Sequence, residues 1–354
     1  MVDIEKTYNQ SLQIKYRFIL ITAVLLFLAI LFSLALGSTN IELSSIFLNL
    51  FTEYDSTTQN ILLNIRLPRI LSAVMAGAAL AVAGAAMQTI LRNPLGSPFT
   101  LGISNAAAFG AAFAVIVLGM GTTQSGNTEA VILDDTLTIS LSAFLWSLVS
   151  TGIIFFLAKF KGATPEVIIL SGIILGSLFS AGITALQYFA NDIEISSIVF
   201  WTFGEIGRAT WSDLKILSGA VLISTMLFVK DRWNYSALKN GDEVAKSLGV
   251  HVERTRLTGL LLASLVTAIT VAFFGIIAFV GLVVPHIVRR IIGGDERFLI
   301  PASALFGSLF LLVSDTVART IIAPVVLPVG ILTSFLGAPL FLYLLIKGIG
   351  KGHW

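Results

Sequence analysis

The stretch that decides the fold is residues 66–108, which read RLPRILSAVMAGAALAVAGAAMQTILRNPLGSPFTLGISNAAA. Between Leu67 and Leu91 the only charged side chain is that of Arg69, close to the start. A helix of about 25 residues rises ~1.5 Å per residue, so it spans a ~30 Å hydrocarbon layer with some tilt. The turn-forming string 92–98 then ends the helix. These residues predict a transmembrane helix.

This helix carries small residues every four positions, at Ala73, Gly77, Ala81 and Ala85, with Gly84 beside them. Small residues four apart allow another helix backbone to approach closely. One interpretation is ordinary packing inside a bundle. The other is a central helix that lines a pathway which larger side chains would block, and Gln88 completes that candidate lining. Both interpretations place the helix in the middle of the protein.

Composition places the whole chain in a membrane. Of its 354 residues, 56% are hydrophobic and only 12% are charged. A soluble domain carries roughly twice that charged fraction. The chain has no cysteine, which excludes disulfides, thiolate metal sites and cysteine nucleophiles.

Apolar segments recur along residues 1–354, which we interpret as a single all-α transmembrane domain of about ten helices, the eighth of them short. The expected spans are 18–36, 67–91, 101–120, 137–158, 167–190, 214–229, 257–274, 276–287, 298–319 and 329–346. A short amphipathic piece at 43–51 is expected to lie at the membrane interface. The longest hydrophilic segment, 230–256, is too polar to cross.

The positive-inside rule orients these spans in the cell membrane so that both termini lie on its cytoplasmic side. In that orientation 17 of the 22 lysines and arginines lie on the inner side. Arg66, Arg69 and Arg319 are exceptions, because they lie at the outer ends of helices. Asp315 precedes Arg319 by four residues and shares its helix face. This pair either neutralises itself structurally or orients Arg319 toward an acidic partner.

The segment 230–256 combines polar residues with an apolar set that a plain loop would not need, which favours a docking surface for another protein. Residues 241–247 resemble a phosphate-binding loop only faintly, because Ala245 stands where glycine is required. We therefore expect this chain to hold no ATP, no metal and no other cofactor, and not to be an enzyme.

Two other classes of protein fit the pattern less well. A secondary transporter is expected to carry ionisable groups within the membrane, and only Asp315 offers one. An intramembrane hydrolase needs a paired nucleophile and base, and His286 has no evident partner. No nucleic-acid partner is expected.

Along nearly its whole length the chain resembles the FecCD-type permease subunits of type II ABC importers, which take up ferric siderophores, haem, cobalamin and some oxyanions. The stretches that carry the resemblance are 66–104, GDEVAKSLGV (241–250), FGIIAFVGLVVPHIVRR (274–290) and LPVGILTSFLGAPLFLYLL (327–345). The resemblance implies a ten-helix permease in the lipid membrane, paired with a second copy around a central path. It also implies two ATPase subunits as partners and an extracellular or periplasmic substrate-binding protein.

The resemblance also implies roles for particular residues. Those expected to meet glutamates of the binding protein are Arg66, Arg69 and Arg319. Those expected to contact the ATPase, within 236–250, are Leu238, Gly241, Ala245, Leu248 and Gly249. An inner gate is expected at Thr164, Pro165 and Glu166. The chain departs from the family at Val326, where a glutamate is common. We expect a permease for a metal chelate, first a ferric siderophore, with cobalamin, haem or molybdate as alternatives.

Overall fold

The structure is a computed structural model that describes residues 4–36, 56–123, 131–133 and 136–349. Each expected span coincides with a helix in these residues. The helices are α1 (Ile4–Ala35), α4 (Leu67–Ile90), α5 (Ile103–Ile116), α6 (Thr136–Lys161), α7 (Pro165–Phe189), α9 (Trp211–Lys230), α12 (Val252–Phe274), α13 (Val280–Ile292), α14 (Glu296–Ala318) and α15 (Val329–Ile349). Seven described helices are long and apolar enough to cross a membrane, and the exceptions among the ten are α5, α13 and α15.

Smaller elements join the long helices. They are α3 (Ser56–Asn60), the π-helix η1 (Ile61–Arg66), the antiparallel strands β1 (Gly121–Thr123) and β2 (Val131–Leu133), and the helices α8 (Asp192–Thr202), α10 (Arg232–Lys239) and α11 (Asp242–Ser247). The short strands and α8 were not predicted, although α8 begins with a capping box between Asn191 and Glu194. The amphipathic piece expected at 43–51 lies outside the described residues.

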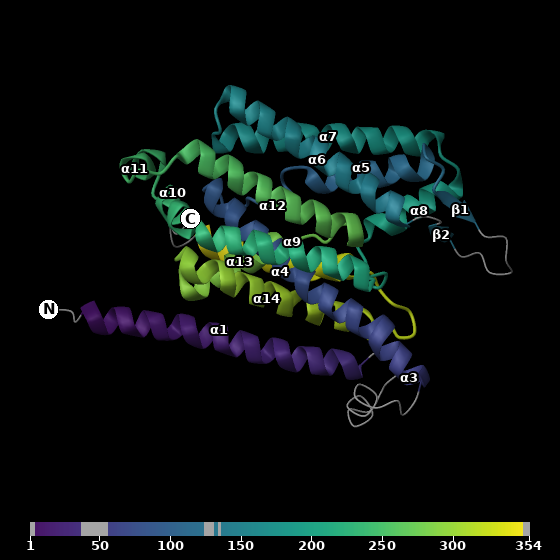
Figure 1. The fold of residues 1–354 in the computed structure, drawn as a ribbon, viewed down its shortest axis with the longest axis horizontal. Helices are drawn as coiled ribbons and strands as arrows, with labels where there is room; N and C mark the ends of the chain where they lie inside the picture. Colours follow the sequence, from purple (N-terminus) through teal and green to yellow (C-terminus); the bar gives the residue numbers. More distant parts are fainter. Residues whose placement is uncertain (1–3, 37–55, 124–130, 134–135, 350–354) are drawn as a thin grey trace.

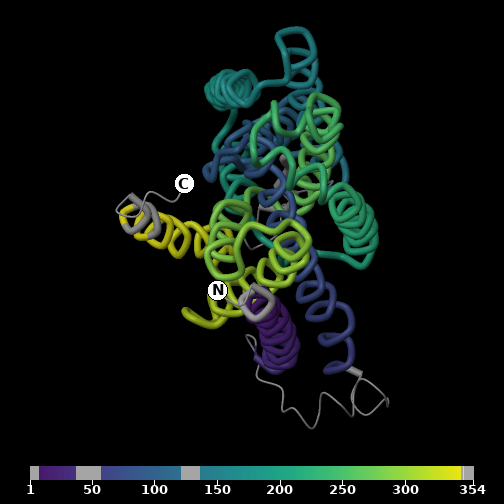
Figure 2. Tube along the Cα trace, turned by 90° about the vertical axis from the view of Figure 1, so that its left-hand side faces the viewer, coloured from purple at the N-terminus to yellow at the C-terminus, as the bar shows by residue number. Residues whose placement is uncertain are grey.

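The long helices lie side by side along one axis, and α4 runs through their centre (Figure 1). It packs against α9, α12, α13 and α14, and its apolar window is the most buried of the seven. Helix α1 lies at one edge of the bundle, and α15 projects from one side (Figure 2). The pair α10 and α11 lies at the same end as the start of α1, opposite β1 and β2 (Figure 1).

Glycines explain why α4 can occupy the centre. A Cβ atom on Gly77 would overlap the backbone carbonyl of Gly307 on α14, and one on Gly84 would overlap that of Gly281 on α13. Backbones in such contact gain dispersion attraction over a long surface without any loss of side-chain entropy. The small-residue spacing therefore places α13 and α14 directly against α4.

Candidate functional site

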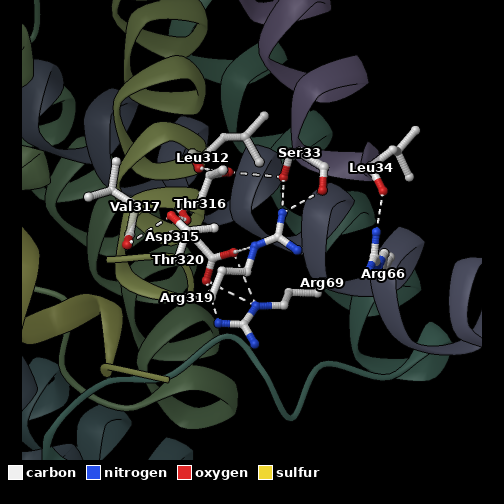
Figure 3. Close-up of polar contacts among 10 residues, drawn as sticks. All are labelled: Ser33, Leu34, Arg66, Arg69, Leu312, Asp315, Thr316, Val317, Arg319 and Thr320. Carbon is white, nitrogen blue, oxygen red and sulfur yellow. Dashed lines mark hydrogen bonds and ion pairs between the residues drawn. The ribbon is translucent and has the colours of Figure 1, made fainter. Parts of the chain in front are cut away.

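Three helix ends meet at the end of the bundle opposite α10 and α11: the C-terminal ends of α1 and α14 and the N-terminal end of α4 (Figure 3). Asp315, which is fully buried on α14, is the centre of this group. Arg69 donates from Nε to both carboxylate oxygens at 3.1 Å and from Nη2 to Oδ1 at 2.8 Å. A charge-assisted fork of this kind is among the stronger polar contacts in proteins.

Two further arginines complete this arginine cluster, which we define as Arg66, Arg69, Arg319 and Asp315. Arg319 Nη2 donates to the carbonyl oxygen and hydroxyl of Ser33 at 2.5 Å. Arg66 Nη1 donates to the carbonyl oxygens of Leu34 at 2.6 Å and Ala35 at 3.2 Å. The last carbonyls of a helix lack partners within the helix and carry partial negative charge. Arg66 and Arg319 therefore cap the C-terminus of α1 (Figure 3).

The cluster refines the sequence interpretation of Asp315. Arg319 Nε lies 3.7 Å from Asp315, so the expected pair is present, but Arg69 is the stronger partner. Arg66 and Arg319 are only 4% and 5% exposed, which means that these guanidiniums point into the protein. Sequence spacing showed the pair that is four residues apart. It could not show a contact between residues 246 positions apart.

Four of the five predicted ATPase-contact residues, at the other end of the bundle, divide into a buried and an exposed pair. Leu238 and Ala245 are fully buried and anchor α10 and α11 on the long helices of the bundle. Leu248 is 66% exposed, and Gly249, which follows it with φ +81°, is also exposed. Gly241 joins the two short helices with φ +110°, a conformation that glycine adopts without strain. The segment thus has an anchored face and an exposed apolar tip.

A buried arginine that the sequence analysis did not single out contacts α11. Arg256, in the first turns of α12, is 2% exposed. It donates to the Asp242 carboxylate at 2.9 and 3.2 Å, to the Ile90 carbonyl at 3.2 Å and to the Ala163 carbonyl at 2.7 Å. The hydrogen bonds from Arg256 lower the pKa of Asp242, so this carboxylate is ionised at neutral pH. The only sequence signal was an arginine directly before an apolar run.

The profile of the FecCD transport family matches residues 25–347. The chain belongs to the FecCD transport family. A relative in Methanocaldococcus jannaschii, assigned as an ABC transporter permease, is 51% identical over 98% of this chain and 99% of its own length. The hemin transport system permease of Yersinia pestis is 39% identical over 90% of this chain and 94% of its own.

A solved structure shows the same architecture. It is an inward-facing conformation assigned to a metal-chelate type of ABC transporter, with a TM-score of 0.81 and 30% identity over 94% of this chain and 99% of that one. This FecCD protein is therefore a multi-pass membrane permease of an ABC importer for metal chelates or related substrates. Permeases of such importers work with ATPase subunits and substrate-binding proteins.

In this FecCD permease the residues expected to form the inner gate begin a helix. Thr164 is the N-cap of α7 and accepts a hydrogen bond from the Val167 amide at 3.4 Å, while Pro165 occupies the first helical position. Thr164 and Glu166 are exposed, and Pro165 is buried. The geometry accounts for these residues as a helix start, and their role as a gate stays a prediction.

The candidate pathway residues of the permease are all enclosed within the single chain. Ala73, Gly77, Ala81 and Gly84 are buried, and the two glycines lie against α14 and α13. Gln88 donates to the carbonyl of Leu282 at 3.0 Å and accepts from Arg289 at 3.2 Å. Packing inside the bundle explains these contacts, and a lining role stays a prediction.

Proposed function

We propose that this chain is the permease subunit through which an ABC importer moves a ferric siderophore into the cytoplasm. Two separate ATPase subunits supply the energy, and the permease itself is non-catalytic and holds no cofactor. The observation that carries this proposal is the segment 230–256. Its buried residues fix it to the bundle and its tip exposes Leu248, as a surface that receives force from a partner requires.

The substrate class rests on chemistry shared by the similar proteins. The Yersinia relative is named for hemin and the solved structure for a metal chelate, so both names describe a metal held by an organic ligand. A ferric siderophore is such a complex, and we propose it first. Haem, cobalamin and molybdate are the alternatives within the family.

We propose that both termini lie in the cytoplasm. In support, α10 and α11, which carry the expected ATPase contact, lie at the same end of the bundle as the start of α1 (Figure 1). The basic residues also concentrate on the side assigned to the cytoplasm. The arginine cluster then faces the side from which a binding protein delivers substrate.

Docking of that binding protein on Arg66, Arg69 and Arg319 stays part of the proposal, with a condition set by the structure. All three guanidiniums already donate to groups within the chain. Glutamates of a partner must therefore share or displace these contacts. Docking then depends on the hydrogen bonds from Arg66 and Arg319 to the end of α1. Reversing Arg66 and Arg69 to glutamate would also disturb the fold, so this variant cannot isolate docking.

We propose that a second permease copy packs beside α15. In support, α15 projects from the bundle (Figure 2) and exposes Phe335, Leu336 and Leu342. The chain has no cysteine, so Phe335→Cys introduces a single reactive thiol. A disulfide-linked dimer formed in membranes is the expected result. A monomer under the same oxidation would place the second copy elsewhere.

Uptake into proteoliposomes tests the function. The permease is reconstituted with its ATPase and binding protein and offered ferrichrome, haem, cobalamin or molybdate in separate reactions. ATP-dependent accumulation of ferrichrome is the expected result, and accumulation of another ligand would move the substrate within the family. Uptake by the permease alone, without ATP, would refute the proposal.

A further inference from the structure

We propose that Arg256 is a positioning residue that mechanically joins α11 to the end of α4 and to the loop before α7. The inference rests on the proposed function, because it assigns a route by which force from an ATPase reaches the transmembrane helices. No metal, cofactor or covalent step is involved. One buried side chain holds three parts of the molecule together.

Arg256 contacts α11 directly. Asp242 is the first residue of α11, and both of its carboxylate oxygens accept hydrogen bonds from Arg256, at 2.9 and 3.2 Å. Arg92 also approaches the same carboxylate, at 3.6 Å, from the chain that follows α4. A displacement of α11 therefore acts on a carboxylate that is attached to the bundle by charged contacts.

The same guanidinium also donates hydrogen bonds to two backbone carbonyls that are far apart in sequence. Nε donates to Ile90, the last residue of α4, and Nη1 donates to Ala163, directly before the predicted gate at Thr164. Neither carbonyl belongs to the helix that carries Arg256. When the guanidinium moves, the end of α4 and the start of α7 are both drawn with it.

The contacts of Arg256 transmit force because breaking them is energetically costly. Arg256 is 2% exposed, and a buried guanidinium that loses its carboxylate becomes an uncompensated charge away from water. Arginine also presents five donors in a rigid planar fork, whereas lysine offers one ammonium group on a flexible stem. The planar fork of Arg256 holds both oxygens of one carboxylate and two separate carbonyls.

A purely structural role makes a different prediction. If Arg256 only fills and neutralises its site, its replacement lowers stability but leaves any response to nucleotide unchanged in the protein that still folds. If Arg256 transmits movement, the folded variant loses the response. The two roles are separated by a reporter on the loop before α7, read with and without nucleotide.

The absence of cysteine makes such a reporter simple. Lys161 is exposed at the end of α6, two residues before Ala163, so Lys161→Cys places one thiol beside the loop. The variant is reconstituted with its ATPase in lipid nanodiscs. The rate of labelling with a soluble maleimide is then measured without nucleotide and after trapping with ADP and vanadate. We expect the two rates to differ several-fold.

The comparison adds Arg256→Gln to the reporter chain. The expected result is that the ATPase still co-purifies and hydrolyses ATP, while labelling of Lys161→Cys no longer depends on nucleotide. Arg290→Gln is the matched control, since Arg290 is an exposed arginine at the same end of the bundle, and it should keep the full response. Asp242→Asn, which weakens only the contact with α11, should reduce the response in a protein that keeps both carbonyl contacts.

The outcomes separate this inference from the proposed function. A full nucleotide response in Arg256→Gln overturns the inference, and if that variant does not fold, a full response in Asp242→Asn does the same. A reporter chain that transports substrate with ATP but shows no change in labelling also overturns the inference, because the loop then does not move. An unmodified permease that shows no ATP-driven uptake would refute the proposed function itself.

Discussion

Replacing Asp315 with asparagine tests the arginine cluster most directly. The substitution keeps the shape of the side chain and removes the carboxylate that Arg69 contacts at 2.8 Å and Arg319 at 3.7 Å. Asp315 is fully buried, so water cannot solvate the guanidiniums in place of the lost carboxylate. Removing one partner of a buried ion pair costs about 3–5 kcal/mol. We expect Asp315→Asn to lose stability in this range.

The assay is thermal unfolding of the detergent-solubilised permease, followed by the monodisperse fraction in size-exclusion chromatography. The midpoint of Asp315→Asn should fall by several degrees. Asp192→Asn is the control, since Asp192 is an exposed carboxylate on α8 and exposed substitutions usually stay within about 0.5 kcal/mol.

A double replacement sharpens the test. Removing Arg69 together with Asp315, as Arg69→Gln with Asp315→Asn, leaves fewer uncompensated charges than Asp315→Asn alone. The double variant should therefore be less destabilised than the sum of the two single variants. If Asp315→Asn unfolded at the temperature of the unmodified permease, the carboxylate would not hold the cluster together and the reasoning would be wrong.

Three other predictions follow from separate contacts. Gly84→Ala places a methyl group against the Gly281 carbonyl and should cost roughly 1–3 kcal/mol in the same unfolding assay, whereas Gly152→Ala, in open space, should be neutral. Leu248→Asp puts a charge on the exposed tip and should abolish co-purification of the ATPase; a retained complex would show that the ATPase binds elsewhere. Hydrogen bonds from Arg297 lower the pKa of Asp295 to about 2. The stability difference between the unmodified permease and Asp295→Asn should therefore be constant from about pH 8 to pH 5 and decline only below about pH 4, as the carboxylate is protonated. A decline already at pH 6 would contradict this.

The sequence predicted the helices well because membrane insertion is governed by local composition. A predominantly apolar run such as 67–91 must form a helix in lipid, where every backbone amide needs a partner. All ten expected spans coincide with helices for this reason. The short strands and α8 were missed, because each is too short to cross a membrane and a search for spanning apolar runs does not detect such elements.

The small residues of α4 show where local information ends. Gly77 and Gly84 at fixed spacing indicated that another backbone lies close, and the structure confirms close contact with Gly307 and Gly281. The spacing could not name the partner helices. It also could not separate packing from a pathway, since both require small side chains on the same face.

The sequence by itself determined the family of this multi-pass permease and where its long apolar helices lie, because helix formation in lipid depends on neighbouring residues. Only the tertiary structure decided what the buried charges do. It turned Arg66 and Arg319 onto the end of α1, paired Arg69 with Asp315, and brought Asp242, Ile90 and Ala163 to Arg256. A charge excluded from water takes the partner that folding brings nearest, and that partner can lie anywhere along the chain.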